Sequence, residues 1–386
     1  MTKKILLIIG ILAVIGVALF LVFGSKPQTA GEEGGGFSIR DYLPFGNSID
    51  TSDNVPTTET NEEQNLPSAP TNGKVPRLRK ISSEPVAGAV IFDVGATKTA
   101  SGTSVVRFVE KGTGNVYEAK SDSNTITRLT NTTIPKIVRA FWLPNGSGFL
   151  AQTLMAESEI IETSFVKLNK NTASTSVESL TPFGTTVSKL PTGIKEIAVS
   201  PDGTKIFYYT VSGSSSWFIS NPDGTGAAQV LSHPLTEWLP KWISANTITM
   251  QTKGSALALS YNYSFDVGNK TLKKIGIAET GISSRTNTLP EKCVELKDKN
   301  PTFYCAVPNQ LPAGNYPDVW YKGLVSTEDF IEKIDLSNDI FYGVADLTDL
   351  SGQKIDVIDP MLSPDESHLI FRNKIDGYLW LLRIGE

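Results

Sequence analysis

The sequence Ile197-Ala-Val-Ser-Pro-Asp-Gly-Thr-Lys-Ile-Phe-Tyr-Tyr-Thr210, continued by Ser216-Trp-Phe-Ile-Ser-Asn-Pro-Asp-Gly-Thr-Gly-Ala-Ala-Gln-Val-Leu231, decides the fold. Runs rich in β-branched and aromatic residues alternate in it with Pro-Asp-Gly turns, a pattern typical of short antiparallel strands joined by hairpins. Four such strands make one antiparallel meander. The stretch therefore predicts one blade of a β-propeller.

The turn residues themselves are expected to be structural. The side chain of an Asp in such a turn accepts a hydrogen bond from the backbone two residues further on. We therefore interpret the four aspartates of these motifs, Asp202, Asp223, Asp365 and Asp376, as turn residues. Calcium ligation is the alternative for the same side chains. The predicted repeat-turn residues are Pro201, Asp202, Gly203, Asp223, Gly224, Pro364, Asp365, Asp376 and Gly377.

Looser copies of the four-strand pattern fill the rest of the chain. The last unit contains only three strands, and Leu78 to Ser82 is expected to supply its missing outer strand, which closes the ring and removes free sheet edges. We therefore predict an all-β, six-bladed propeller over residues 74–386. Its units are expected at 86–129, 138–169, 197–231, 238–275, 293–336 and 361–382.

The turn motifs also resemble those of a known family. Ser200-Pro-Asp-Gly-Thr-Lys-Ile206, followed by Asn221-Pro-Asp-Gly-Thr-Gly226, is similar to the WD40-like (PD40) repeat of TolB-like propellers, and Ser363-Pro-Asp365 repeats half of it. The resemblance covers two blades well and the others loosely. It implies the propeller fold. A membrane anchor is expected in place of the α/β domain that precedes the TolB propeller.

The first residues predict a membrane anchor. Lys3 and Lys4 precede Ile5 to Phe23, an uncharged apolar run that would span roughly 28 Å as a helix, close to the thickness of a bilayer core. We predict an uncleaved transmembrane signal anchor over residues 5–23, with residues 1–4 in the cytoplasm and everything after Gly24 on the extracytoplasmic side of the membrane. A cleaved signal peptide and a pilin-like assembly helix are the alternatives.

Residues 24–73 predict a disordered acidic linker, because they are rich in Gly, Pro, Ser, Thr, Asn and Glu. One island carries more large apolar side chains than a spacer needs. It is interpreted either as a short helix lying on the membrane or the propeller, or as a docking motif for a partner. Its apolar residues are Phe37, Ile39, Tyr42, Leu43 and Phe45.

The two cysteines of the chain predict a disulfide. Cys293 and Cys305 flank the turn-forming stretch Asp298 to Pro301, so a hairpin folded there places them opposite each other. Two unpaired thiols are the alternative. Zinc or redox chemistry is disfavoured, because the CxxC spacing and neighbouring histidines are absent.

Signals for other chemistry are weak. The chain has 35 basic and 40 acidic residues and shows no basic patch, so we expect no nucleic-acid partner. His233 and His368 are interpreted as surface or turn residues. No nucleophile elbow, P-loop or dinucleotide motif is present, so we expect no enzyme activity, cofactor or metal. Most tryptophans are expected to pack between blades, while Trp238 and Tyr316 to Tyr321 could line a rim.

The fifth unit is the least regular. Its strands are expected at Cys293–Leu296, Thr302–Val307, Asp318–Tyr321 and Phe330–Leu336. Because its connections are the longest, we take it as the expected binding face, with Gln310 to Pro317 and the segment Ser326 to Asp329, a candidate helix cap.

The expected function is a membrane-anchored, extracytoplasmic propeller that binds a protein of the cell envelope as a scaffold. A carbohydrate (cell-wall) binding module is one alternative. A hydrolase or lyase with a site in the central channel is the other.

Overall fold

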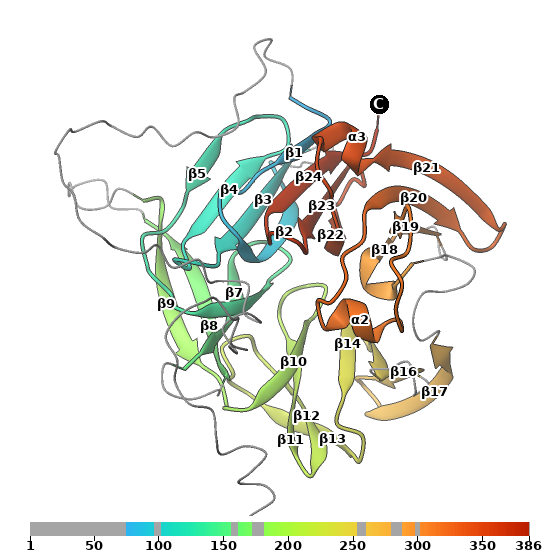
Figure 1. The fold of residues 1–386 in the computed structure, drawn as a ribbon. Coiled ribbons are helices and arrows are strands. Elements are labelled where there is room, and N and C mark those ends of the chain that lie inside the picture. The colour runs from blue at the N-terminus through green and yellow to red at the C-terminus, as the bar shows by residue number, and fades with distance from the viewer. Residues whose placement is uncertain are drawn as a thin grey trace, which may run out of the picture. The chain divides into compact units, whose positions relative to one another are not determined.

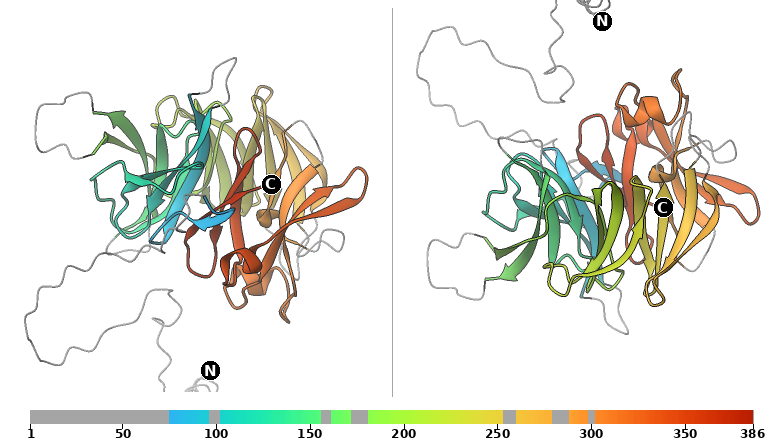
Figure 2. Two further views of the ribbon diagram at one scale, coloured as in Figure 1. Left: turned by 90° about the horizontal axis from the view of Figure 1, so that it is seen from above. Right: turned by 90° about the horizontal axis from the view of Figure 1, so that it is seen from below.

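The computed structural model describes residues 75–95, 102–155, 161–171, 181–252, 260–278, 288–297 and 302–385. In this part of the chain, six separate four-stranded antiparallel sheets are arranged around a common axis (Figure 1). Figure 2 shows the same blades from two further directions. The predicted six-bladed propeller with four-stranded blades is confirmed.

The first five blades run in chain order, and the first strands of most neighbouring blades contact one another around the axis. Blades 1 and 2 consist of β2 (Val86–Val94), β3 (Thr103–Glu110), β4 (Val116–Lys120), β5 (Ile126–Arg128), β6 (Ile137–Trp142), β7 (Gly148–Leu154), β8 (Ile161–Lys170) and β9 (Phe183–Lys189). Blades 3 and 4 consist of β10 (Ile194–Val199), β11 (Ile206–Ser212), β12 (Ser214–Ser220), β13 (Ala228–His233), β14 (Trp238–Ser244), β15 (Thr247–Thr252), β16 (Ser260–Asp266) and β17 (Thr271–Ala278).

The two remaining blades contain the short helices. Blade 5 consists of η2 (Pro290–Lys292), β18 (Cys293–Glu295), β19 (Thr302–Pro308), α2 (Asp318–Tyr321), β20 (Asp329–Asp335) and β21 (Ile340–Asp346), with α3 (Leu347–Ser351) after it. Blade 6 consists of β22 (Val357–Leu362), β23 (His368–Asn373), β24 (Leu379–Arg383) and β1 (Leu78–Lys80).

The ring closes between the two ends of this domain. β1 pairs antiparallel with β24, so the sheet order of blade 6 is β1-β24-β23-β22. Ile81 continues the contact, because its N–H donates to the Leu379 carbonyl at 2.8 Å. The outer strand of blade 6 therefore comes from the start of the domain, as predicted.

The core lies between adjacent blades. Phe207, Trp217, Trp238 and Phe265 form one such cluster between blades 3 and 4, and the rings of Trp217 and Trp238 meet edge to face at 5.0 Å. Trp238 is completely buried, so its expected place at a rim is wrong. All six tryptophans lie in the interior, which agrees with packing between blades as their main role.

Blade 5 departs from the predicted strands. The segment Asp318–Tyr321 is the helix α2 and not a strand: Pro317 precedes it with helical dihedral angles, and Trp320 turns inward and is 3% exposed. The outer strand is β21, which the sequence interpretation missed because α2 had been counted in its place. Ser326 to Asp329 caps no helix, since Asp329 begins β20.

In the described ranges, no helix is long and apolar enough to cross a membrane. The predicted anchor (5–23), the linker (24–73) and the apolar island at Phe37 to Phe45 all lie outside the described residues.

Candidate functional site

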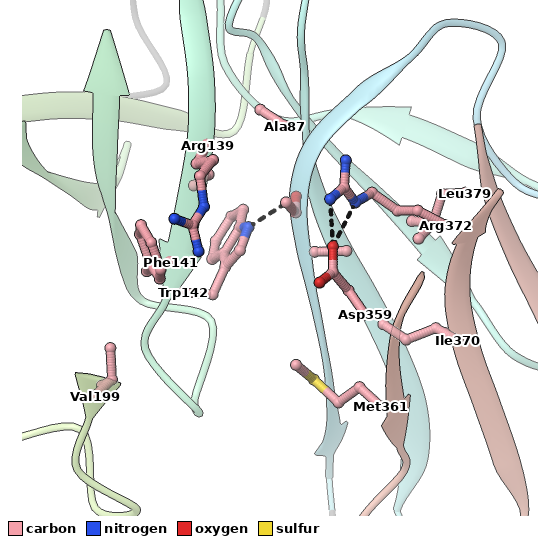
Figure 3. Close-up of a pocket in the computed structure, with 13 residues that line it drawn as sticks. Ala87, Arg139, Phe141, Trp142, Val199, Asp359, Met361, Ile370, Arg372 and Leu379 are labelled. Carbon is pink, nitrogen blue, oxygen red and sulfur yellow. Dashed lines mark hydrogen bonds and ion pairs between the residues drawn. The ribbon is translucent and has the colours of Figure 1, made fainter. Parts of the chain in front are cut away.

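A cavity of about 280 Å3 opens where the inner strands of four blades meet around the axis (Figure 3). Side chains of β6 line one side and those of blade 6 line the other, with β2 between them. Its lining residues are Ala87, Gly88, Ala89, Arg139, Ala140, Phe141, Trp142, Val199, Asp359, Met361, Ile370, Arg372 and Leu379.

The inner strands share a local irregularity that shapes this cavity. The pairing register shifts between Val86 and Gly88 in β2 and between Ile137 and Arg139 in β6. It shifts again between Ile194 and Glu196 in β10, and over Asp359 in β22. A bulge bends its strand and re-aims the neighbouring side chain. In three of these strands the shift falls at or beside a charged residue, namely Arg139, Glu196 and Asp359.

β2 and β6 are in close contact beside the cavity. A Cβ on Gly88 would lie 2.0 Å from the Ala140 carbonyl oxygen, so only glycine allows this approach. The Trp142 indole Nε1 donates to the Gly88 carbonyl at 3.1 Å, which ties the two strands together (Figure 3). The backbones of blades 1 and 2 therefore have little freedom beside the cavity.

Arg139 provides the first cationic group. Its Nη1 donates to the Glu196 carboxylate at 2.7 Å, and its guanidinium lies over the Phe141 ring at 4.5 Å from the centroid. The Arg139 side chain remains 45% exposed. The guanidinium is thus oriented by a neighbouring blade while one face stays accessible.

Arg372 provides the second cationic group, on the opposite side of the cavity in Figure 3. Its Nε donates to Asp359 Oδ2 at 2.9 Å, and its Nη1 donates to the Val86 carbonyl at 3.2 Å. Asp359 has φ +51°, a left-handed conformation that is uncommon for a residue other than glycine. The Asp359 side chain is 65% exposed, so an incoming ligand can reach the ion pair.

These side chains are suited to binding an anion. Two guanidiniums with apolar surface beside them can hold a carboxylate and the chain that carries it. The two carboxylates at the mouth, Glu196 and Asp359, are each engaged by an arginine. The lining set contains no histidine, cysteine or serine that could act as a base or nucleophile.

The predicted turn aspartates lie elsewhere, each in its own hairpin. Asp202 Oδ1 accepts hydrogen bonds from the Ser200 hydroxyl at 2.6 Å and the Thr204 N–H at 3.0 Å. These contacts lower the pKa of Asp202 to about 2. Asp223, Asp365 and Asp376 accept from the N–H two residues on in the same way. In the described part of the chain, no group of three or more His, Cys, Asp or Glu side chains could hold a metal ion.

Neither histidine lines the cavity, and both are half-buried. The ring of His233 lies against those of Trp217 and Trp238, and burial lowers its pKa. His368 shares a hydrogen bond with the Ser367 hydroxyl at 2.7 Å. Both side chains belong to local packing at strand ends.

The predicted disulfide is confirmed. Cys293 in β18 lies directly opposite Cys305 in β19, with their Cα atoms 4.1 Å apart and the two sulfurs bonded. The bond links the two inner strands of blade 5.

The sequence interpretation missed the residues around the cavity. Arg139 lies within the expected first strand of its blade, whereas Glu196 and Asp359 lie just before the expected strand starts at Ile197 and Met361. A charged residue in an otherwise apolar inner strand is the signal that could have found them, because inner strands contribute to the axis.

No family model and no curated protein matches the sequence. Among solved structures, TolB from Acinetobacter baumannii is similar over 71% of this chain and 60% of its own, with 11% identity and a TM-score of 0.38. Oligogalacturonate lyase from Vibrio parahaemolyticus matches 80% of this chain and 94% of its own, with 8% identity and a TM-score of 0.45. The β-propeller domain of the Trilobed protease from Pyrococcus furiosus matches 78% and 86%, with 10% identity and a TM-score of 0.38.

The expected likeness to TolB-like propellers is confirmed at the level of the fold, which the strand order of the six sheets establishes. The chain spans less than two thirds of the TolB structure. The activities in the names of these proteins belong to those proteins and are not assigned to this chain.

Proposed function

We propose that this chain is a membrane-anchored, extracytoplasmic β-propeller that acts as a non-enzymatic scaffold, binding an envelope protein at the mouth of its axis. The observation that carries the proposal is the pair of oriented guanidiniums, Arg139 and Arg372, beside accessible apolar surface. Met361, which is 37% exposed, contributes to that surface. A protein segment with an acidic side chain or a terminal carboxylate next to an apolar residue fits these groups.

The mouth of the axis, where the cavity lined by Arg139 and Arg372 opens, is a better candidate for the binding face than the fifth unit. Thr327 and Asp329, from the segment expected to bind, are 1% and 0% exposed and so cannot meet a partner. Of the two expected segments, Gln310 to Pro317 keeps exposed residues, and Leu324 and Tyr342 elsewhere in the unit are exposed as well.

The two alternatives have less support. All six tryptophans are buried, and the exposed rings of Tyr321 and Tyr342, on which a sugar could stack, lie outside the lining of the cavity. The aspartate whose burial raises its pKa, Asp329, is enclosed in blade 5 and not in the channel. A general acid must reach its substrate, so this carboxyl does not support a hydrolase or lyase.

The anchor rests on the apolar run at 5–23 and the lysines before it. The full chain should stay with the membrane on alkaline extraction, and a variant lacking residues 5–23 should be released. External protease should degrade the propeller in intact spheroplasts. Protection of the propeller until the membrane is opened would contradict the proposed topology.

The binding face can be tested with a photo-crosslinking amino acid at Met361 in the anchored full chain. We expect a protease-sensitive adduct that Arg139→Glu abolishes. Arg128→Glu is the matched control, because Arg128 lies in the outermost strand β5 and bonds Asn131 there. An adduct digested by a muramidase would favour the cell-wall alternative. An adduct unaffected by Arg139→Glu would reject the mouth as the binding face.

A further inference from the structure

A lysine and two aspartates are buried together where blade 5 meets blade 6. Lys292 ends η2, Asp329 begins β20 and Asp356 directly precedes β22. Their side chains are 1%, 0% and 0% exposed. The Lys292 Nζ lies 2.5 Å from Asp329 Oδ2 and 2.7 Å from Asp356 Oδ1. An amine therefore contacts two carboxyl groups in a place closed to water.

The two carboxyl groups have different surroundings. Asp356 also accepts hydrogen bonds from the Trp320 Nε1 at 3.1 Å, the Thr327 N–H at 3.1 Å and the Thr327 hydroxyl at 2.9 Å. Donors of this kind stabilise a carboxylate. Asp356 thus has three hydrogen-bond donors besides Lys292.

Asp329 is less well satisfied. Its Oδ2 accepts from the Val357 N–H at 2.7 Å, whereas its Oδ1 is buried with no hydrogen-bond partner among the described residues. Burial raises the pKa of the Asp329 carboxyl, against the opposing effect of Lys292. A buried carboxyl oxygen without a partner is costly and requires an explanation.

We propose that Lys292 and Asp329 are joined by an intramolecular isopeptide bond. Lys292 Nζ forms a bond to Asp329 Cγ, and the bond from Cγ to Oδ1 breaks. Oδ1 leaves as water and takes two of the three protons of the Lys292 ammonium, while the third stays on the new amide. Ammonium and carboxylate become a neutral amide plus water, and no oxidant, reductant or further reactant takes part.

The neighbouring groups fit the steps of this condensation. Asp356 Oδ1 contacts Nζ, so it can accept the first proton and pass it to the departing oxygen, ending as the carboxylate it was. The Val357 N–H polarises Oδ2, which becomes the amide oxygen. Fixing the amine against the carboxyl replaces a slow bimolecular reaction by an intramolecular one.

The product accounts for the unsatisfied oxygen. Oδ1 is the atom that departs, and a buried ion pair, expensive to desolvate, becomes a neutral amide. Asp356 keeps its hydrogen bonds from Trp320 and Thr327. The bond would close a ring across the 37-residue separation between Lys292 and Asp329, which contains α2. It would act beside the Cys293–Cys305 disulfide without depending on redox conditions, and it does not rest on the proposed binding function.

The test is the mass of the full chain, purified in detergent, then reduced, alkylated and denatured. We expect the folded wild-type chain to be one water lighter than its sequence. After digestion, the peptides that contain Lys292 and Asp329 should be recovered as one branched species. This peptide measurement is independent of any processing at the amino terminus.

Variants separate an isopeptide bond from an ion pair. Lys292→Arg and Asp329→Ala should give only linear peptides, and Asp356→Ala should lose the branch although both joined residues are present. Asp329→Asn should form the same amide by releasing ammonia, and so reach the wild-type branched mass. Lys374→Arg is the matched control and should keep the branch. The Lys374 Nζ lies 4.9 Å from the centroid of the Trp320 ring, beside the cluster, but Lys374 is not one of the joined residues.

The wild-type chain alone can overturn the proposal. Linear Lys292 and Asp329 peptides from a folded chain with its disulfide intact would reject the bond. A branch from Lys292 to Asp356 would reject the assignment of Asp329.

Discussion

Leu78 lies directly opposite Leu382 across the pair of strands that closes the ring, although the two residues stand near opposite ends of the domain. They are 6% and 0% exposed and belong to one cluster with Phe371 and Trp380. β1 is only 3 residues long, so few backbone hydrogen bonds hold it. Closure of the propeller therefore depends strongly on the packing of this side chain.

Leu78→Ala should lower the free energy of unfolding by about 2–4 kcal/mol, because it removes buried apolar contact and leaves a cavity. Denaturant unfolding of the detergent-solubilised chain measures this change. Leu324→Ala is the control: Leu324 is 61% exposed and its truncation should change stability by less than about 0.5 kcal/mol. If Leu78→Ala and Leu324→Ala changed the free energy of unfolding equally, the packing of β1 would not stabilise the closed ring.

Much of the fold was predictable because propeller blades combine local signals. The Pro-Asp-Gly turns fix hairpins, and apolar strands between them have one structural solution when six units must close on themselves. The position of β1 followed from counting strands. α2 was not predictable in this way, because its four residues resemble a strand and their inward turn depends on the contact of Trp320 with Asp356.

The candidate site was less predictable than the fold. Arg139 and Glu196 meet across blades 2 and 3, and the inner strands that carry them belong to different sheets. No ladder register therefore links their positions. Lys292 was missed for another reason: charged residues are usually exposed, so a buried cluster of them leaves no periodic pattern.

Gly88→Ala should destabilise the chain by about 1–3 kcal/mol, since the added Cβ meets backbone that cannot rotate away. The added Cβ would lie 2.0 Å from the Ala140 carbonyl oxygen. Thermal and denaturant unfolding report the loss. Gly343→Ala, in β21, is the matched control, because nothing lies within 4 Å of its added Cβ. An unchanged midpoint for Gly88→Ala would mean that β2 and β6 are not in close contact at the cavity.

The Asp202 turn should make stability depend on pH in the acid range. The Ser200 hydroxyl and the Thr204 N–H lower the pKa of Asp202 from the usual 3.8 to about 2. Its stabilising effect is therefore present above about pH 4 and lost as the pH falls through about 2. The difference in urea midpoint between wild type and Asp202→Ala should shrink over this window. A constant difference down to pH 2 would argue against the ionised turn.

Removal of the disulfide should destabilise blade 5. The bond between Cys293 and Cys305 spans a separation of 12 residues, and closing a loop of this size contributes about 3 kcal/mol in the chain-entropy model. The double variant Cys293→Ala/Cys305→Ala should lose an amount of that order in denaturant unfolding. The reduced wild type should match the double variant, and a reduced chain as stable as the oxidised one would contradict the expected contribution.

Tyr209→Phe tests how blades 3 and 4 are joined. The Tyr209 hydroxyl donates to the Trp238 carbonyl at 3.2 Å and accepts from the Trp238 N–H at 3.1 Å, in a place where both residues are buried. Phenylalanine keeps the packing but leaves a buried backbone donor and acceptor without their partner. The loss should be about 1–3 kcal/mol, since an unsatisfied buried group costs more than a hydrogen bond contributes. Tyr342→Phe, at a side chain that is 54% exposed, should change stability by less than about 0.5 kcal/mol. If both variants unfold at the wild-type midpoint, water must replace the hydroxyl, and the junction between the blades is open to solvent.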